Sequence, residues 1–386
     1  MRGLFKIFYI LFIVSVNING PDFFYTRELT FIPLVFFIVY YSELRGLGLW
    51  FEFSIWYFFT LLLNAFISTE HLAVSNGLYL YLGFVYLILL ATVSKENTKL
   101  IIWTYVFTAV VVSIFIVAIW LITFYSEEYR LVLMSLLDDI ESSKVAFILM
   151  IRERKILDWW VPGVYFGTAP ILIPALGYLL FGLLNKTSVK MFLMSMILIF
   201  GLLATASRAN LICVFALVCG FILLKLLKRG FRRLFFLLSS IICLIIFLFI
   251  LALLSDTDEG SLEVKDLHYA SYRLLFSEDI LRTIFIGWAG GSEFYTLAYN
   301  DWIGLTELSY LESVRRFGLI ATFILIIRLW IPPLLGSLRQ GIPGYMIVLT
   351  IICYLFVAGT NPYLFGSIGF LSVVYFRAIV LSNKNF

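Results

Sequence analysis

Long apolar segments follow one another through most of this chain, and their length limits what it can fold into. A helix needs about 20 residues to cross the hydrocarbon core of a bilayer, and it must satisfy its own backbone hydrogen bonds there. Only 13% of the residues are charged, whereas a soluble domain carries about 25%. The sequence therefore predicts an all-α, polytopic integral membrane protein in which residues 1–386 form a single membrane domain.

About twelve segments have the length and composition of membrane-spanning helices. The first resembles a signal peptide, but no small-residue cleavage site follows it, so we count it as a span. The second is interrupted by Pro33. The predicted spans are residues 4–19, 29–41, 48–67, 72–93, 100–124, 162–184, 191–206, 209–227, 234–254, 317–331, 343–357 and 363–381.

Lysine and arginine residues are concentrated in every second loop between the predicted spans. Short loops of this composition remain on the cytoplasmic side of a membrane. The alternation predicts that both chain termini are cytoplasmic and that two long segments, residues 126–161 and 255–316, lie on the outer side. The basic residues used here are Arg2, Lys6, Arg45, Lys95, Lys99, Lys186, Lys190, the cluster at 225–233, Arg339 and Lys384.

One arginine, Arg208, lies in the otherwise apolar stretch LLATASRANLICVFAL. An arginine costs about 2.5–3.5 kcal/mol at the centre of a membrane on insertion scales, and less near an interface. The predicted topology puts Arg208 at the outer end of a span, beside the two long outer segments. It either extends its charged group to the interface with no further role, or it binds an anion there.

The first outer segment combines an apolar stripe with a basic cluster. Apolar residues recur at every third position from Leu131 to Ile140, which predicts an amphipathic helix along the bilayer surface. Arg152 and Arg154 belong to the cluster RERK, which is followed by two tryptophans. This cluster is either an interfacial anchor or a contact for a lipid-linked phosphate.

The second outer segment is the largest polar part of the chain. We expect a helix over residues 272–285 that carries Arg273 and Arg282. The stretch GWAGGSEF that follows is either an ordinary glycine-rich turn or a place where backbone N–H groups approach an anion. TELSYLESVRRFG is then predicted to be a helix that leads into the next span, with Glu307 and Tyr310 on one face.

Nothing in the composition predicts a metal or a cofactor. The four cysteines lie inside apolar runs, and the chain has only two histidines, His71 and His268, which we expect to be solvated turn or loop residues. The acidic pairs lack the spacing of a calcium-binding loop, and there is neither a phosphate-binding loop nor a nucleophile elbow. The partners we expect are the lipid bilayer and a lipid-linked substrate, with no nucleic acid.

Arginines on the outer side, with acidic and aromatic residues beside them, suit a diphosphate on a polyprenyl carrier. A guanidinium group pairs with two phosphate oxygens at once and neutralises the charge of a departing diphosphate. The acceptor hydroxyl needs a base, which is worth about 10²–10⁴-fold in rate, and Glu307 is the predicted base. The predicted pyrophosphate-binding residues are Arg208, Arg273, Arg282, Arg315 and Arg316, with Tyr310, Arg152 and Arg154 as further substrate contacts.

Three elements in the second half of the chain resemble those of a known family. TASRAN lies at the outer end of a span, Arg273 precedes a short helix and IGWAGGSEF, and ELSYLESVRRFGLI leads into the next span with Gly318 late in the element. In this order and topology, the chain resembles the O-antigen polymerases (Wzy type) of the O-antigen ligase and polymerase superfamily.

The resemblance implies a GT-C-type glycosyltransferase with two long periplasmic loops in the bacterial inner membrane. Such an enzyme transfers a growing chain from its undecaprenyl-diphosphate carrier to an incoming carrier-linked oligosaccharide unit at the periplasmic face, as part of lipopolysaccharide biosynthesis. A separate chain-length regulator is the implied partner protein. By position, Arg208 and Arg273 become pyrophosphate ligands.

Three other functions fit parts of the sequence. O-antigen ligases have a histidine at about the position of Glu307, and this chain departs from that pattern. A flippase or other secondary transporter suits about twelve spans, but its functional charges usually lie near the middle of the bilayer, where this chain has few apart from Glu52. A membrane acyltransferase would need a histidine base in the membrane, for which only His71 is available.

Overall fold

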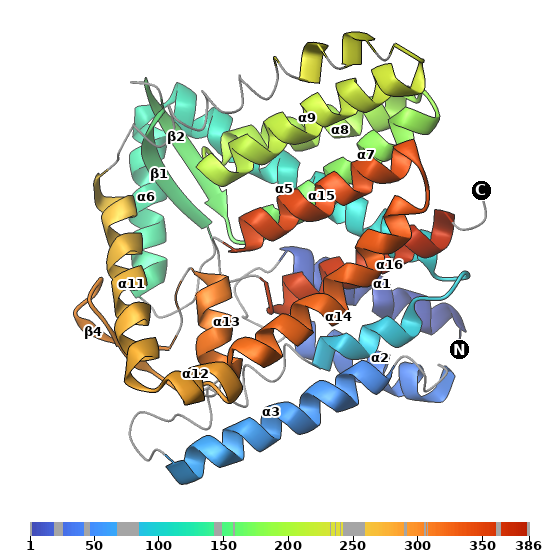
Figure 1. The fold of residues 1–386 in the computed structure, drawn as a ribbon. Coiled ribbons are helices and arrows are strands. Elements are labelled where there is room, and N and C mark those ends of the chain that lie inside the picture. Colours follow the sequence, from blue (N-terminus) through green and yellow to red (C-terminus); the bar gives the residue numbers. More distant parts are fainter. Residues whose placement is uncertain are drawn as a thin grey trace.

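The computed structural model is nearly all-α, with helices packed side by side in a bundle (Figure 1). Five of the described helices are long and apolar enough to cross a membrane: α3 (Gly48–Ile67), α5 (Thr98–Tyr125), α9 (Arg208–Lys228), α14 (Leu319–Leu338) and α15 (Ile342–Gly359). The structure describes residues 2–18, 26–41, 47–67, 85–142, 149–156, 159–231, 233–235, 237–239, 241, 259–288, 292–304, 306, 308–359 and 364–383.

Shorter apolar helices coincide with further predicted spans. They are α1 (Arg2–Ile18), α2 (Thr26–Tyr41), α7 (Leu172–Asn185), α8 (Val189–Ala204) and α16 (Ser367–Asn383). The predicted span over residues 72–93 is described only from Val85 onwards, and it contains the short 3-10 helix η2 (Tyr86–Thr92). The predicted span over residues 234–254 lies mostly outside the described residues.

Contacts between helices that are distant in sequence hold the bundle together. The rings of Tyr105 on α5 and Tyr375 on α16 stack with their centroids 4.1 Å apart, and the Tyr105 hydroxyl is hydrogen-bonded to Ser372 Oγ at 2.9 Å. Farther along α5, Ser113 Oγ donates to the carbonyl of Ile197 on α8 at 2.6 Å. Close packing and interhelical hydrogen bonds of this kind hold helices together in lipid, where apolar burial gives little driving force.

Bonds at the helix ends establish which ends lie together. Lys228, at the end of α9, donates to the carbonyl of Leu184 near the end of α7 at 2.8 Å. Arg208 begins α9 and therefore lies at the opposite end of the bundle. α15 contacts α9 closer to that opposite end, where Cys213 Sγ is 3.4 Å from the carbonyl oxygen of Cys353. Both chain termini lie at the end of the bundle where α9 finishes (Figure 1).

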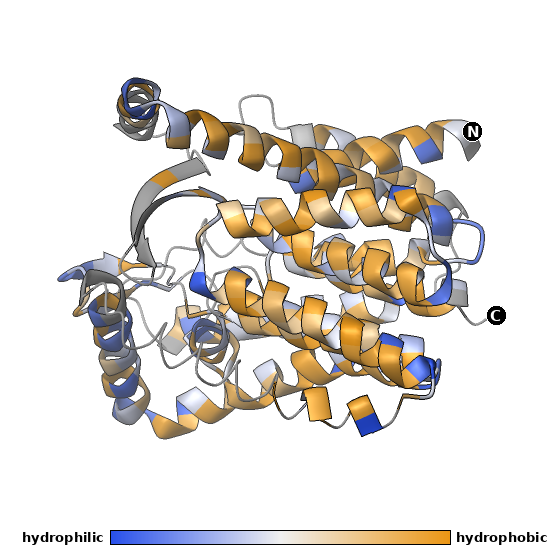
Figure 2. Cartoon of the chain, turned by 90° about the horizontal axis from the view of Figure 1, so that it is seen from above, coloured by the Kyte–Doolittle hydropathy of each residue, from blue (hydrophilic) through white to orange (hydrophobic). Residues whose placement is uncertain are grey.

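Both long polar segments fold at the end away from the chain termini (Figure 1). Figure 2 shows hydrophobic residues along the bundle helices and hydrophilic residues gathered at the two ends. The first segment contains α6 (Glu127–Ser142) and an antiparallel hairpin of β1 (Leu149–Ile156) and β2 (Trp159–Phe166). The second contains α11 (Glu259–Glu278), α12 (Ile280–Phe285), the hairpin β3 (Phe294–Thr296) and β4 (Asp301–Ile303), and α13 (Ser309–Phe317).

The hairpin of β1 and β2 corrects one prediction. The sequence predicts a single helical span over residues 162–184, but Pro162 pairs with Glu153 in the hairpin, and the strand continues to Phe166. A helix begins only with η3 (Ala169–Ile171), where Pro170 occupies a first-turn position that proline favours. Apolar composition does not distinguish a buried strand from a helix, which explains the difference.

Two helix boundaries, at Asp279 and at Gly318, divide the helices of the second segment. The predicted helix over 272–285 is split at Asp279, whose carboxylate accepts a hydrogen bond from the backbone N–H of Arg282 at 2.8 Å and so caps α12. The helix that leads into the span at Leu319 ends at Phe317. Gly318 has φ +79°, a left-handed conformation that ends α13 before α14 begins.

Candidate functional site

Arg315, on α13, is fully buried, which is rare for an arginine unless its donors are paired. Its Nε and Nη2 donate to the two carboxylate oxygens of Glu312, at 3.0 and 2.6 Å. Its Nη1 donates to the carbonyl and the hydroxyl of Ser292, at 2.8 and 2.7 Å, and its Nη2 also donates to the carbonyl of Gly304 at 2.9 Å. All five N–H groups of this guanidinium therefore have an acceptor in the protein.

The position of these acceptors gives Arg315 a structural role. Ser292 precedes β3 and Gly304 follows β4, so one guanidinium ties both sides of this hairpin to α13. The sequence predicts Arg315 as a pyrophosphate ligand. In this arrangement its donors hold the second polar segment together, and none remains for a substrate.

Glu312 is the centre of the cluster. The hydroxyl of Tyr272, from α11, donates to Glu312 Oε2 at 2.6 Å and lies 2.5 Å from Thr306 Oγ1. Burial raises the pKa of Glu312, but the charges of Arg315 and Arg316 and the hydrogen bonds from Arg315 and Tyr272 outweigh it and lower the pKa to about 2. Burial and the neighbouring Glu312 raise the pKa of Tyr272. Glu312 is therefore ionised at neutral pH and is a poor proton acceptor.

Arg316 donates to the same carboxylate, but not all of its N–H groups have an acceptor among the described residues. Its Nε donates to Glu312 Oε1, and its Nη2 donates to the carbonyl of Gly304 at 3.0 Å. Within the described part of the chain, its Nη1 has no hydrogen-bond acceptor, and 11% of the side chain is exposed. Among the described residues, two guanidinium groups thus face one carboxylate, which leaves an excess of one positive charge, and Arg316 is the more exposed of the two.

Arg282, on α12, is bonded to α3, one of the helices that are long and apolar enough to cross a membrane. Its Nη2 donates to Asn64 Oδ1, its Nε donates to the carbonyl of Gly287 at 3.2 Å, and its guanidinium lies 5.1 Å from the ring centroid of Trp288. Burial lowers the pKa of Arg282, and the negative charge of Asp279 opposes this effect. The side chain therefore has a fixed position between α3 and the loop that follows α12.

The same face of α3 also contacts α13. The ring of Phe317, next to Arg316, lies 5.5 Å from that of Trp56 and 6.2 Å from that of Tyr57. Tyr57 and Asn64 are seven residues apart, or about two helical turns, so they lie on one face of α3. Arg282 and the residue that follows Arg316 therefore contact a single helix face about two turns apart, and α12, α13 and α3 meet at this end of the bundle (Figure 1).

Two glycines let α12 approach the junction of α13 and α14. Gly287 has φ +73°, and a Cβ atom there would lie 2.6 Å from the backbone nitrogen of Gly318. A Cβ atom on Gly318 would lie 2.9 Å from the backbone nitrogen of Ile286. The N–H of Trp288 donates to the carbonyl of Arg315 at 2.6 Å across this crossing. Only glycine combines these conformations with such a close backbone approach.

Arg208 and Tyr310 lie at the same end of the bundle. Arg208 is half-buried at the start of α9, after a turn in which Asn210 Nδ2 donates to Thr205 Oγ1 at 3.0 Å. The Tyr310 hydroxyl donates to the carbonyl of Leu355 at 3.0 Å, and a Cβ atom on Gly359 would lie 2.2 Å from its ring. Tyr310 thus links the start of α13 to the C-terminal part of α15.

The remaining predicted site residues are Arg273, Glu307, Arg152 and Arg154. Arg273 is exposed on α11, next to Tyr272, whose side chain is buried toward Glu312. Glu307, the predicted base, lies outside the described residues, as do the side chains of Arg152 and Arg154, whose backbones form part of β1.

His268 departs from its predicted place in a solvated loop. It is buried on α11, where its Nδ1 lies 3.1 Å from Thr296 Oγ1 and its ring contacts that of Tyr299. The described residues contain no group of three or more histidine, cysteine, aspartate or glutamate side chains that could hold a metal ion. The large described cavity lies at the other end of the bundle, with Lys186 and Arg339 on its wall, so it is separate from Glu312 and Arg316.

The sequence contained one signal for the Glu312 cluster that our prediction did not use. Glu312 precedes Arg315 by three residues and Arg316 by four, which is the spacing of ion pairs on a helix. Burial of this triad, and its contacts with Tyr272 and the β3–β4 hairpin, depend on residues distant in sequence.

A comparison of the chain with known protein families, curated proteins and solved structures gives no match.

Proposed function

We propose that this protein is a membrane glycosyltransferase of the O-antigen polymerase type. It joins undecaprenyl-diphosphate-linked oligosaccharide units at the periplasmic face of the bacterial inner membrane. The proposed architecture has about twelve membrane spans of the GT-C type, with both termini in the cytoplasm. The resemblance of the three sequence elements that contain Arg208, Arg273 and Gly318 is the basis of this assignment.

The observation that supports the proposal most is the set of hydrogen bonds that Arg316 makes and the N–H groups that it leaves over. Its guanidinium is held on one side by Glu312 and Gly304, while Nη1 has no acceptor among the described residues. Donors that are oriented before the reaction stabilise a developing negative charge without having to reorganise, which is the largest single contribution in many enzymes. Arg316 therefore suits a departing diphosphate, while Arg315 and Glu312 fix its position.

Two further arginines at this end of the bundle add to the positive electrostatic potential near Arg316. Arg282 lies on the α3 face that also contacts Phe317, and Arg208 begins α9 at this end. In the proposed reaction, the anomeric carbon of the growing chain bonds to a hydroxyl of the incoming unit. The bond from that carbon to the diphosphate oxygen breaks, and the hydroxyl proton goes to a base.

Glu307 remains our candidate for that base. Glu312, the nearest carboxylate in sequence that the structure describes, has a pKa of about 2 and is paired with two arginines. A general base works best when its pKa lies near the working pH. Arg273 remains a candidate ligand from the exposed face of α11, and Arg152 and Arg154 remain candidates from β1.

Deletion of the gene, followed by electrophoresis of lipopolysaccharide, tests the proposal. We expect the ladder of long chains to disappear and a band with a single repeat unit to remain. Loss of every O-antigen band, including the single unit, would instead indicate a ligase or a flippase and would overturn the assignment. Re-expression of the wild-type gene is the control and should restore the ladder.

A further inference from the structure

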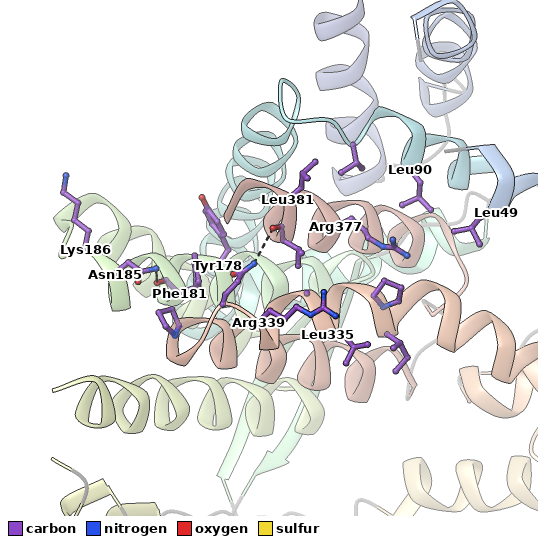
Figure 3. Close-up of a pocket in the computed structure, with 17 residues that line it drawn as sticks. Leu49, Leu90, Tyr178, Phe181, Asn185, Lys186, Leu335, Arg339, Arg377 and Leu381 are labelled. Carbon is purple, nitrogen blue, oxygen red and sulfur yellow. Dashed lines mark hydrogen bonds between the residues drawn. The ribbon is translucent and has the colours of Figure 1, made fainter. Parts of the chain in front are cut away.

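A second group of basic residues surrounds a cavity of about 1500 Å³ at the end of the bundle where α9 finishes (Figure 3). Leu49 near the start of α3, Val93 after η2, Lys186 after α7 and Arg339 after α14 all line it. The sequence assigns these four chain positions to the cytoplasmic side independently of one another. Their presence around one cavity agrees with that assignment.

The charges on the cavity wall are unbalanced. The described lining residues include Lys186, Arg339 and Arg377, and they include no aspartate or glutamate. Figure 3 shows Arg377 on α16 and Arg339 after the end of α14 on the wall, with Lys186 farther along. Glu52, an acidic residue on α3, lies 2.5 Å from Arg328 and is already paired. No carboxylate pairs with Arg377 in the described part of the structure.

Arg377 donates to a backbone carbonyl of α14 that lacks its usual helical partner. Its Nη2 donates to the carbonyl of Arg328 at 3.0 Å. In a regular helix that carbonyl would accept from the residue four positions later, but this residue is Pro332, which has no N–H. The Nε of Arg377 is buried and finds no hydrogen-bond partner among the residues that the structure describes. A cation held in an apolar helix with an unsatisfied donor favours an anion close by.

Most of the other lining residues are apolar, and Tyr178, Asn185 and Gln340 are the polar exceptions. Leu90, Leu335 and Val380 line the cavity beside the basic residues. Its volume exceeds the roughly 300–1,000 Å³ that is usual for small-molecule sites. A ligand that matches this wall has a negatively charged group for the arginines and a hydrocarbon part for the leucines and the valine.

We infer that this cavity binds the phosphate headgroup of an anionic phospholipid of the cytoplasmic leaflet. The phosphate lies between Arg377 and Arg339, and the acyl chains follow the apolar wall. Basic pockets between membrane helices on the cytoplasmic side bind such headgroups, and guanidinium groups match phosphate oxygens. The inference depends on the cavity and on the predicted orientation, and not on the proposed glycosyltransferase reaction.

The test uses the full-length protein in nanodiscs that contain phosphatidylcholine and phosphatidylglycerol, with bound lipid counted by native mass spectrometry. We expect phosphatidylglycerol to be enriched over phosphatidylcholine, and Arg377→Gln to weaken its retention about 5-fold, as expected for one cation near a membrane surface. Arg377→Lys should retain most of the binding. Arg339→Gln alters an exposed residue and provides a second test if Arg377→Gln fails to fold.

Lys190→Gln is the matched control. Lys190 lies at the start of α8, four residues after Lys186. Its ammonium group lies over the ring of Trp103, 5.8 Å from the centroid, and it is not among the lining residues. Equal loss of phosphatidylglycerol in Lys190→Gln and Arg377→Gln would overturn the site. Thermal protection by inorganic phosphate alone, equal to that by phosphatidylglycerol, would overturn the lipid assignment. Because no variant is scored by polymerisation, the result is independent of the proposed function.

Discussion

Glu312 and Arg315 lie one helical turn apart on α13 and are joined by two hydrogen bonds, of 2.6 and 3.0 Å, in a position closed to solvent. Arg316 donates to the same carboxylate from the other side. A single buried carboxylate thus pairs with two cations and neutralises only one positive charge. Arg315 has every donor occupied, whereas Arg316 does not.

Loss of the carboxylate should destabilise the protein strongly. In Glu312→Gln, two neighbouring guanidinium groups lose their counter-charge, and removal of one partner from a buried ion pair costs about 3–5 kcal/mol. We expect a clear fall in the thermal unfolding temperature of the purified protein in detergent. Glu263→Gln, at an exposed position on α11, should leave it nearly unchanged. Equal unfolding temperatures for Glu312→Gln and wild type would contradict the role of the cluster.

The same carboxylate predicts a pH dependence. Its pKa is lowered from an ordinary value of 4.5 to about 2 in the folded protein. A lowered folded-state pKa stabilises the protein above pH 4.5, and this contribution is lost as the pH falls toward 2. The difference corresponds to about 3 kcal/mol.

Unfolding measured from pH 7 to pH 3 in wild type and Glu312→Gln checks this expectation. The gap between the two proteins should be constant above about pH 5, because the carboxylate is ionised in both folded and unfolded chains there. It should narrow progressively below pH 4.5. A gap that stayed the same down to pH 3 would show that Glu312 does not titrate as described.

Substitution of Arg315 and substitution of Arg316 should have different effects. Arg316→Ala removes the guanidinium with spare donors, and we expect about a 10²–10³-fold loss of polymerisation at a normal protein level, as for loss of one oriented donor. Arg315→Ala leaves Glu312 and the β3–β4 hairpin without their link, so the amount of folded protein should fall.

Lipopolysaccharide ladders read together with immunoblots of membrane fractions separate these effects. Arg316→Lys keeps the charge but not the two-point geometry and should restore only part of the activity. Arg229→Ala, an exposed position after α9, serves as the control. A complete ladder from Arg316→Ala at normal protein level would remove Arg316 from the proposed site.

The crossing at Gly287 should not tolerate a side chain. Gly287→Ala combines a left-handed backbone, worth about 1–2 kcal/mol for an L-residue, with a contact of 2.6 Å to the backbone of Gly318. Gly230 has a similar φ of +85°, but a Cβ atom there meets nothing within 4 Å. Gly230→Ala should therefore show the conformational cost alone. If the two variants had the same unfolding temperature, the close approach would have no energetic importance.

Membrane character and most helices followed directly from the sequence. The described helices α3, α5, α9 and α15 coincide with predicted spans to within a few residues, because the thickness of the bilayer imposes a length on each apolar run, and α14 runs seven residues past its predicted end. The hairpin of β1 and β2 escaped prediction, because an apolar run is compatible with either secondary structure until its partner strand is known.

The candidate site was predicted in part. Arg282, Arg316 and Arg208 were named from the sequence, and the structure brings them to one end of the bundle. The sequence did not distinguish Arg315, whose donors are all occupied, from Arg316 beside it. That difference depends on Ser292 and Gly304, which reach α13 only through the fold of the β3–β4 hairpin.

By itself, then, the sequence determined that this chain has helices long and apolar enough to cross a membrane, where most of its helices run, and which loops carry positive charge. These are local properties, because they depend on the length and composition of short segments. Only the tertiary structure decided which charges are neutralised and which remain available. Arg282 meets Asn64 across 218 residues of sequence, and Arg328 meets Glu52 across 276. The availability of a charged group depends on its neighbours in space, and in this chain many of them are distant in sequence.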